Sequence, residues 1–340
     1  DLPDPLFQST PLHIACVNGQ LEMVKVLLSV GANVKALNYM NFTPLIEASA
    51  KGFDAVVKEL MDHHADESLT DKDGNTALHW ASAEGREGVV KVLLLHSMMM
   101  DCFQVETRNS RDSRTALHMA SDRGKVEIMK MLITVGHAEV NKRDSSGQTA
   151  LHMACEGGYL DAVIVLIGCG AEIEAEDKDG RTPMHMCSSR LRGIGGEELM
   201  MKLIRYGADI NHMDHNGFTP LHLATEGGCI SAMRVLLGLG ADVMCLSKPR
   251  KANQHVKGNV TPLHVACQSL SINNEEVVLT LLRWGAEANS GPLDSSGRTP
   301  MELFTTKGAN EDGIMGFSRF PPNKVSIKLI LQHSTIRTDD

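Results

Sequence analysis

The sequence is poor in aromatic residues and contains no long apolar run. Aromatic side chains make up 4% of its 340 residues, although 42% of the residues are hydrophobic. No stretch approaches the 18 consecutive apolar residues that suggest a membrane-spanning helix, and no charged-then-apolar leader opens the chain. We therefore expect neither direct membrane insertion nor a secretory signal. The shortage of bulky side chains also argues against one large globular core.

The sequence also contains relatively few basic residues. Acidic residues outnumber basic ones, which gives a formal net charge of −9. Nucleic-acid binding requires clustered Lys and Arg to neutralise phosphates, so the sequence predicts no nucleic-acid partner. We expect a soluble monomer. The first residue is Asp rather than Met, which suggests a piece of a longer protein with further domains.

Paired cysteine motifs are absent as well. The eight cysteines stand at positions 16, 102, 155, 169, 187, 229, 245 and 267, and no Cys-x-x-Cys pair occurs among them. This spacing favours free thiols over disulfides or zinc. The sequence therefore predicts no metal, no cofactor and a reducing compartment, which is the cytoplasm or the nucleus.

One hexapeptide recurs along the whole chain. It reads Thr-Pro-Leu-His-x-Ala, with its clearest copy at 219–224. Nine copies in phase, each followed by the same helical apolar pattern and most by a Gly-Ala turn, cannot be chance. The copies start at Thr10, Thr43, Thr76, Thr115, Thr149, Thr182, Thr219, Thr261 and Thr299, 33 to 42 residues apart.

A period near 33 residues that carries Thr-Pro-Leu-His-x-Ala resembles the ankyrin-repeat family. The resemblance implies an all-α solenoid of stacked helix-turn-helix units with β-hairpin fingers, forming one domain over residues 7–335 with tails at 1–6 and 336–340. In each unit, the Thr-Pro pair predicts the start of a first helix, because Thr caps the helix and Pro tolerates the first helical position. Glycines such as Gly52 and Gly85 predict its end.

The seven histidines of the hexapeptide could suggest a metal site or a catalytic set. They are His13, His79, His118, His152, His185, His222 and His264. We interpret them as structural, because one per repeat places them too far apart for shared coordination and the resemblance implies a bond between each His and its own Thr. Ile46 and Glu302 replace the histidine in repeats two and nine. No phosphate-binding loop or nucleophile elbow is present, so we expect no enzyme.

Four insertions interrupt the period, and loops on a rigid scaffold often carry function. Residues 97–114 form either an apolar contact loop or a loop folded back on the repeats. Residues 191–196 lengthen one turn. The basic segment 248–257 is either a solvated loop or an anchor for acidic partner residues. Residues 307–324 separate the two helices of the last repeat, whose second helix is expected at 325–331.

The resemblance also implies a concave binding surface made of finger tips and the exposed side of each first helix. Asn38 and Asp71 are expected among its exposed positions. Asn141, Asn211 and Asn289 follow the Gly-Ala turns, where the family can be hydroxylated, or they serve as ordinary turn residues. Aromatic and arginine side chains often dominate interface energies. The predicted partner-binding residues are Tyr39, Phe42, Arg114, Arg123, Glu156, Arg181, Phe218 and Glu226.

Three functions agree with these features. The first is a non-enzymatic scaffold or adaptor that binds a partner protein or peptide. The second is a regulatory or targeting segment of a larger enzyme, such as a ubiquitin ligase or a kinase. The third is the cytosolic ankyrin region of a membrane channel. All three use the same module, and only the flanking domains would distinguish them.

Overall fold

The structure is a computed structural model of the chain. It describes residues 3–4, 6–99, 104–189, 196–248, 259–268, 274–289 and 291–307. Within these ranges no helix is long and apolar enough to cross a membrane.

The described residues form seventeen helices, arranged as first and second helices of successive repeats. The first helices are α1 (Pro11–Val17), α3 (Pro44–Lys51), α5 (Ala77–Glu84), α7 (Ala116–Asp122), α9 (Ala150–Gly157), α11 (Pro183–Ser189), α13 (Pro220–Glu226), α15 (Pro262–Gln268) and α17 (Pro300–Lys307). The second helices are α2 (Leu21–Ser29), α4 (Asp54–Asp62), α6 (Glu87–Met99), α8 (Val126–Thr134), α10 (Leu160–Gly168), α12 (Gly196–Arg205), α14 (Ile230–Gly238) and α16 (Asn274–Arg283). All nine predicted first helices are present, which confirms the all-α repeat fold.

The threonine of the hexapeptide starts each first helix. Thr43 has an extended backbone, and its hydroxyl accepts a hydrogen bond from the Ile46 N–H at 3.1 Å, which caps α3. Pro44 follows at the first helical position, where its missing N–H is no loss. α3 ends at Gly52, whose φ of 92° lets the chain turn into the second helix. With only eight residues, α3 depends on packing for its stability.

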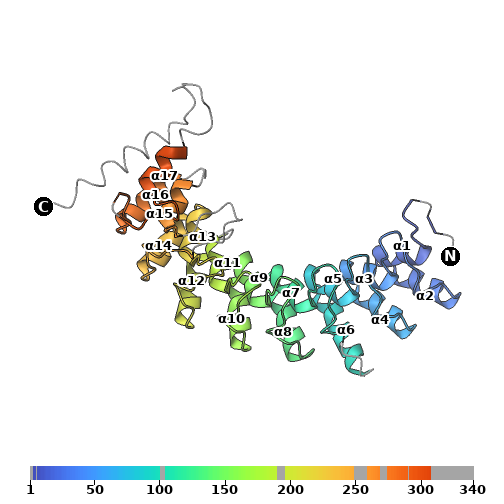
Figure 1. Cartoon of the computed structure of the whole chain (residues 1–340). Coiled ribbons are helices and arrows are strands. Elements are labelled where there is room, and N and C mark those ends of the chain that lie inside the picture. Colours follow the sequence, from blue (N-terminus) through green and yellow to red (C-terminus); the bar gives the residue numbers. More distant parts are fainter. Residues whose placement is uncertain are drawn as a thin grey trace. The chain divides into compact units, whose positions relative to one another are not determined.

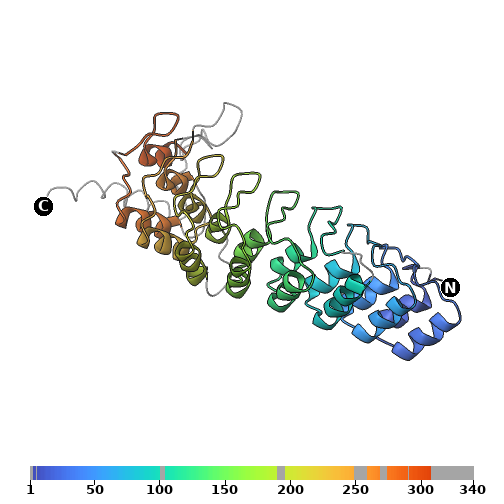
Figure 2. The same cartoon turned by 90° about the horizontal axis from the view of Figure 1, so that it is seen from below.

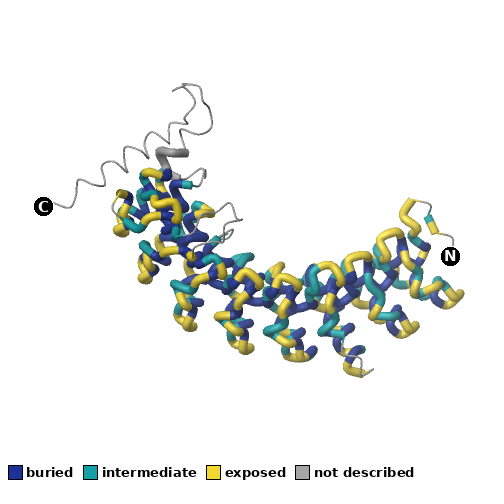
Figure 3. The backbone as a smooth tube through the Cα atoms, viewed as in Figure 1, coloured by how far each residue is buried: buried dark blue, intermediate teal, exposed yellow. Residues whose placement is uncertain are grey.

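The second helix of each repeat buries one face. In α4, Val57, Leu60 and Met61 are buried, while Lys58 is exposed. Apolar residues three and four positions apart lie on the same side of a helix, so this spacing gives α4 one apolar stripe. Buried residues accordingly follow the contacts between helices, and exposed ones gather at helix ends and in loops (Figure 3).

Contacts divide the chain into two compact units. The first comprises Asp1–Ala154 and Asp161–Glu172, and the second comprises Cys155–Leu160 and Ile173–Asp340. In the first unit α1, α3, α5 and α7 pack in sequence, and so do α2, α4, α6 and α8 (Figure 1). In the second unit α11, α13, α15 and α17 pack in sequence, as do α12, α14 and α16. Inner repeats are thus buried between their two neighbours, as in a solenoid.

A loop that we call a finger leads from the second helix of one repeat to the first helix of the next. Within each unit the fingers project from the same side of the helices (Figure 2). We expected β-hairpins here, but no strand is present among the described residues. Each finger is instead a tight turn closed at its base, for example by the Asp144 N–H, which donates to the Gln148 carbonyl at 2.8 Å. One such bond is too short a ladder to form a strand pair.

The predicted insertions lie largely outside the described residues. This applies to the turn at 191–195, to the basic segment from 249 onward, to residues 308–324 and to the final helix at 325–331. The predicted start of the 97–114 loop is wrong, because α6 continues through Met99. At the base of the basic insertion, the Ser247 N–H donates to the Val260 carbonyl at 3.0 Å. The finger that contains this insertion therefore closes like the others.

Candidate functional site

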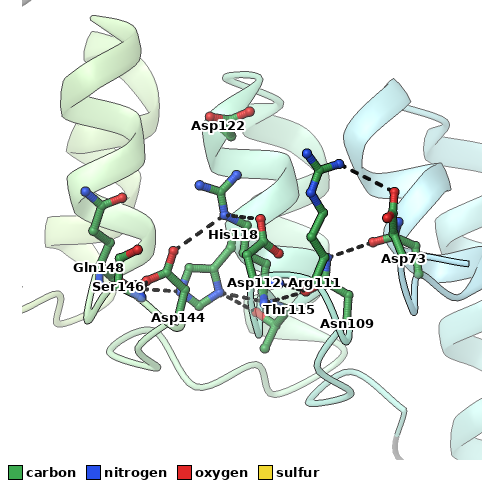
Figure 4. Close-up of polar contacts among 12 residues, drawn as sticks. Asp73, Asn109, Arg111, Asp112, Thr115, His118, Asp122, Asp144, Ser146 and Gln148 are labelled. Carbon is green, nitrogen blue, oxygen red and sulfur yellow. Dashed lines mark hydrogen bonds and ion pairs between the residues drawn. The ribbon is translucent and has the colours of Figure 1, made fainter.

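The repeated Thr and His form a closed pair within each repeat. The Thr115 N–H donates to His118 Nδ1 at 3.2 Å, and the Thr115 hydroxyl lies 2.9 Å from the same nitrogen (Figure 4). A backbone N–H can only donate, so Nδ1 accepts and the ring hydrogen of the neutral imidazole stands on Nε2. The same contact joins Thr10 to His13, Thr76 to His79, Thr149 to His152, Thr182 to His185, Thr219 to His222 and Thr261 to His264.

The other ring nitrogen reaches the next repeat. His185 Nε2 donates to the Phe218 carbonyl at 3.0 Å, and Phe218 directly precedes the threonine of the following repeat. Equivalent bonds join His13 to Phe42, His79 to Arg114, His118 to Gln148, His222 to Val260 and His264 to Arg298. Each of these histidines therefore ties its own first helix to the base of the next finger.

Burial keeps these imidazoles neutral. Burial lowers the pKa of His185 and of His222 to about 4, and the bond to the carbonyl of the next finger offsets only part of this effect. The pKa values of four others are lowered for the same reason, namely those of His13, His79, His118 and His264. A neutral imidazole with both nitrogens bonded cannot also bind a metal or transfer a proton.

The two repeats without the histidine show what it contributes. In repeat nine, the Thr299 N–H donates to Glu302 Oε2 at 2.9 Å, and the Glu302 N–H donates to Thr299 Oγ1 at 3.2 Å. The carboxylate thus completes a capping box at the start of α17. In repeat two, Ile46 offers only its backbone N–H to Thr43. A carboxylate or an alkyl side chain can thus replace the histidine. The side chain at this position therefore helps to form the start of the first helix.

A buried Asp, Asn or Ser organises each described finger after the first, and sequence reasoning missed it. Asp214 is fully buried, and its Oδ1 accepts the backbone N–H groups of Asn216 and Phe218, both at 2.8 Å. These bonds hold the turn in one conformation. Oδ1 does the same at Asn38, Asp71, Asn109, Asp144, Asp177 and Asp294. A signal was available, because the Asp and Asn residues of this set stand five or six positions before the repeat threonine.

The expected exposure of Asn38 and Asp71 is therefore wrong, since both side chains are buried inside their fingers. Their remaining polar atoms also have partners within the chain. Trp80 Nε1 donates to Asp71 Oδ2 at 2.9 Å, and Asn38 Nδ2 donates to Glu47 Oε1 at 3.1 Å. Neither finger residue is left to contact a partner.

Two of the predicted binding arginines lie beside finger carboxylates. Arg114 Nε lies 3.2 Å from Asp112 Oδ2 and 3.5 Å from Asp144 Oδ2. Figure 4 labels both of these aspartates. Arg181 Nε lies 3.6 Å from Asp214 Oδ2. Both arginine side chains are partly buried. They balance buried charges of their own unit, so they are not displayed as free anchors.

Neighbouring fingers are joined through the main chain. The Ser110 N–H donates to the Asp73 carbonyl at 3.0 Å, and the His215 N–H donates to the Asp179 carbonyl at 2.8 Å. This close approach requires glycine: Gly74 has a φ of 81°, and a Cβ there would lie 2.2 Å from Ser110 N. Within a unit, adjoining fingers are thus held at fixed spacing.

The tip of each finger is its most exposed part. We define the tip as the two residues that follow the buried finger residue, or Leu6 and Phe7 in the finger before α1. In the first unit the other tips are Tyr39 and Met40, Lys72 and Asp73, Ser110 and Arg111, and Ser145 and Ser146. In the second unit the described tip residues are Lys178 and Asp179, His215 and Asn216, Lys248, and Ser295 and Ser296.

The remaining predicted binding residues divide between the two units. In the first unit, Tyr39 is an exposed tip residue, Phe42 is half-buried at the base of the same finger, and Arg123 is exposed directly after α7. In the second unit, Glu226 is exposed at the end of α13, and Glu156 is half-buried in α9. Three of these residues thus belong to the first unit and two to the second.

Comparison with protein families decides what these repeats are. The family described as "Ankyrin repeats (3 copies)" matches six overlapping segments that together run from residue 1 to residue 292. The chain belongs to the ankyrin-repeat family. Among solved structures, the ankyrin repeat domain of Bcl-3, titled a unique member of the IkappaB protein family, is similar at 30% identity with a TM-score of 0.56. The match covers 67% of this chain and 98% of that chain. No curated protein matches significantly.

Ankyrin repeats are in general protein–protein interaction modules. In this ankyrin chain, however, Phe218 cannot serve as the exposed anchor that we predicted, because only 6% of it is exposed. Its ring stacks on His222 at a centroid distance of 5.2 Å and packs with Leu223, Val260 and Val265. The next repeat therefore covers Phe218.

Several buried cysteines of this ankyrin chain offer little reactivity. The described cysteines are free thiols, and burial raises the pKa of Cys16, Cys187 and Cys267 to about 12. Such thiols stay protonated at neutral pH and are poor nucleophiles. Within the described ranges, no group of three or more His, Cys, Asp or Glu side chains is placed to hold a metal ion.

Proposed function

We propose that this ankyrin chain is a non-enzymatic scaffold or adaptor that binds a protein or peptide through its finger tips and the exposed side of its first helices. The observation that carries the proposal is the contrast between finger bases and finger tips. At the bases, backbone N–H groups donate to buried side chains such as that of Asp144, and the tip residues Ser145 and Ser146 remain exposed. Such a surface is rigid before a partner arrives, which lowers the ordering cost of binding.

Three further features support this proposal. Both ring nitrogens of most repeat histidines are engaged in holding the fold, so these residues are poor candidates for catalysis. The acidic net charge of −9 disfavours nucleic acid as a partner. The free thiols suit a reducing compartment, and we therefore place the protein in the cytoplasm or the nucleus, as a monomer.

Site-specific photo-crosslinking tests the proposed surface. A photoreactive phenylalanine analogue is introduced at Lys72 or Ser145, which are tip residues of the first unit, and at Lys130 as the control. Lys130 is also exposed, but it lies on the second helix α8, where it pairs with Glu127 at 2.7 Å. We expect the tip positions to capture the same partner protein in cells and the Lys130 position not to capture it. Equal capture from Lys130, or none from either tip, would contradict the proposal.

A further inference from the structure

The tips of the first two fingers differ from every later tip that the structure describes. Leu6 and Phe7 in the finger before α1, and Tyr39 and Met40 in the finger before α3, are 79%, 52%, 44% and 40% exposed. The described residues at later tips are Lys, Asp, Ser, Arg, His or Asn. Tip side chains lie outside the core, so the packing of the repeats does not require apolar residues there.

We propose that these four residues, the apolar tip patch, dock an extended segment of a partner protein in which an apolar side chain stands beside an acidic residue. The proposal rests on the binding function proposed above and names the chemistry of the partner.

The two tips form one continuous patch. The Tyr39 N–H donates to the Phe7 carbonyl at 3.0 Å, and the two rings lie 5.6 Å apart between centroids. Phe42, at the base of the same finger as Tyr39, makes a second aromatic pair with Trp80 of the next repeat at 5.3 Å between centroids, and Trp80 Nε1 donates to Asp71 Oδ2 at 2.9 Å. The contact between Phe7 and Tyr39 restricts the rotamers of both patch rings before binding, which is how aromatic anchors gain affinity at low entropic cost.

A cation borders the patch. Lys72 Nζ lies 5.5 Å from the centroid of the Tyr39 ring. The carboxylate next to it in the chain, Asp73, pairs with Arg111 at 3.5 Å instead. The ammonium group can therefore face a partner carboxylate while an adjacent apolar side chain covers Tyr39 and Met40. Complementary charge at the rim of an apolar contact favours one register of the bound segment.

A lipid surface is the other target that exposed aromatic residues and a lysine could suit. Stable attachment to a bilayer requires more apolar area than a few side chains supply, or a cluster of basic residues. Here the tip next to the patch carries Asp73 as well as Lys72, and the chain as a whole is acidic, with a net charge of −9. A single lysine can pair with one partner carboxylate, but it is not the basic cluster that attachment to an anionic membrane requires.

A random peptide library displayed on phage, selected on the whole 340-residue chain, tests this inference. Selected peptides are then measured against the double variant Tyr39→Ser/Met40→Ser, against Lys72→Glu and against the control Lys130→Ala, which changes an exposed residue of the second helix α8 outside the finger tips. We expect the selected peptides to share an apolar residue beside Asp or Glu. The first variant should weaken their binding by at least about tenfold, as loss of an anchor residue does. Lys72→Glu should weaken the acidic peptides more than versions carrying Asn or Gln. The control should bind like the wild type.

Three results would overturn the inference: peptides that bind the Tyr39→Ser/Met40→Ser variant as well as the wild type, peptides without the acidic and apolar pair, or Tyr39-dependent binding to phosphatidylcholine and phosphatidylserine vesicles. The melting temperature of each variant, followed by circular dichroism, shows that the fold is retained. If crosslinks form at Lys72 and Ser145 while the selected peptides ignore the patch, only the patch inference fails. If neither tip position captures a partner, the proposed binding function itself fails.

Discussion

Acidification from pH 6.5 to pH 4 is expected to remove much of the stability of this protein. His185 and His222 have pKa values of about 4 in the folded chain, because burial disfavours their charged forms. In the unfolded chain a histidine titrates near its ordinary value of 6.5. Between these values the unfolded chain binds more protons, so the free energy of unfolding falls as the pH falls. Each of the two histidines contributes about 3 kcal/mol to this loss, at about 1.4 kcal/mol per pH unit.

Other groups modify the size of this effect. The lowered pKa values of His13, His79, His118 and His264 add to the loss. Glu47 and Glu174 oppose it, because burial raises their pKa and the folded chain takes up their protons more readily. The histidines outnumber these two groups, so the net direction stands.

Denaturant unfolding followed by circular dichroism at several pH values between 7.5 and 4 measures this loss. The matched control is His64→Asn, which removes an exposed histidine at a positive φ of 60°, a conformation that Asn tolerates. We expect this variant to show the same pH dependence as the wild type. A midpoint that stays constant from pH 7 to pH 4.5 would show that the repeat histidines are not held neutral by burial.

Replacement of Asp214 by Ala should lower the free energy of unfolding by about 3 to 5 kcal/mol. The change leaves the backbone N–H groups of Asn216 and Phe218 without their acceptor and removes the charge opposite Arg181. Because Arg181 is partly exposed, its side chain can turn toward water, and the loss arises mainly from the two N–H groups.

Asp214→Asn separates these contributions. An amide keeps the Oδ1 acceptor, and Asn38 and Asn109 already organise two fingers in this way, so we expect a smaller loss of about 1 to 2 kcal/mol. Asp179→Ala is the control, because Asp179 is an exposed tip residue of a neighbouring finger, and it should change stability by less than about 0.5 kcal/mol. Chemical denaturation of the three variants measures these changes in the free energy of unfolding. Equal effects of Asp214→Ala and Asp179→Ala would contradict the role of the buried finger carboxylates.

The repeat fold could be predicted well from the sequence, because the start and the end of each helix are set by interactions between residues close in sequence. Thr43 and Pro44 start a helix, and Gly52 ends it, through interactions within a few residues. The structural role of the histidines followed from the same regularity. Residues whose environment depends on the next repeat were predicted less well. The ring of Phe218 packs with Val260, 42 positions along the chain, and nothing in the local sequence shows this contact.

The exposure of the predicted binding residues also depends in part on the next repeat. Tyr39 and Arg123 are exposed as predicted, since tips and helix ends project from the repeats. Arg114 and Arg181 have the same chemical character, but each reaches a finger carboxylate about thirty residues away in sequence. The finger carboxylates themselves could have been found from their regular spacing before the repeat threonine. Their burial depends on a backbone turn that composition alone does not reveal.

The most direct test is the protonation state of the seven repeat histidines, measured by NMR of the side-chain nitrogens at pH 7. If these residues hold each finger to the neighbouring repeat, every one of them carries its hydrogen on Nε2 and accepts at Nδ1 from its own threonine. We expect neutral rings of this single tautomer, including His152 and His222. Charged rings at pH 7, or the hydrogen on Nδ1, would show that the histidines do not hold the fingers in place.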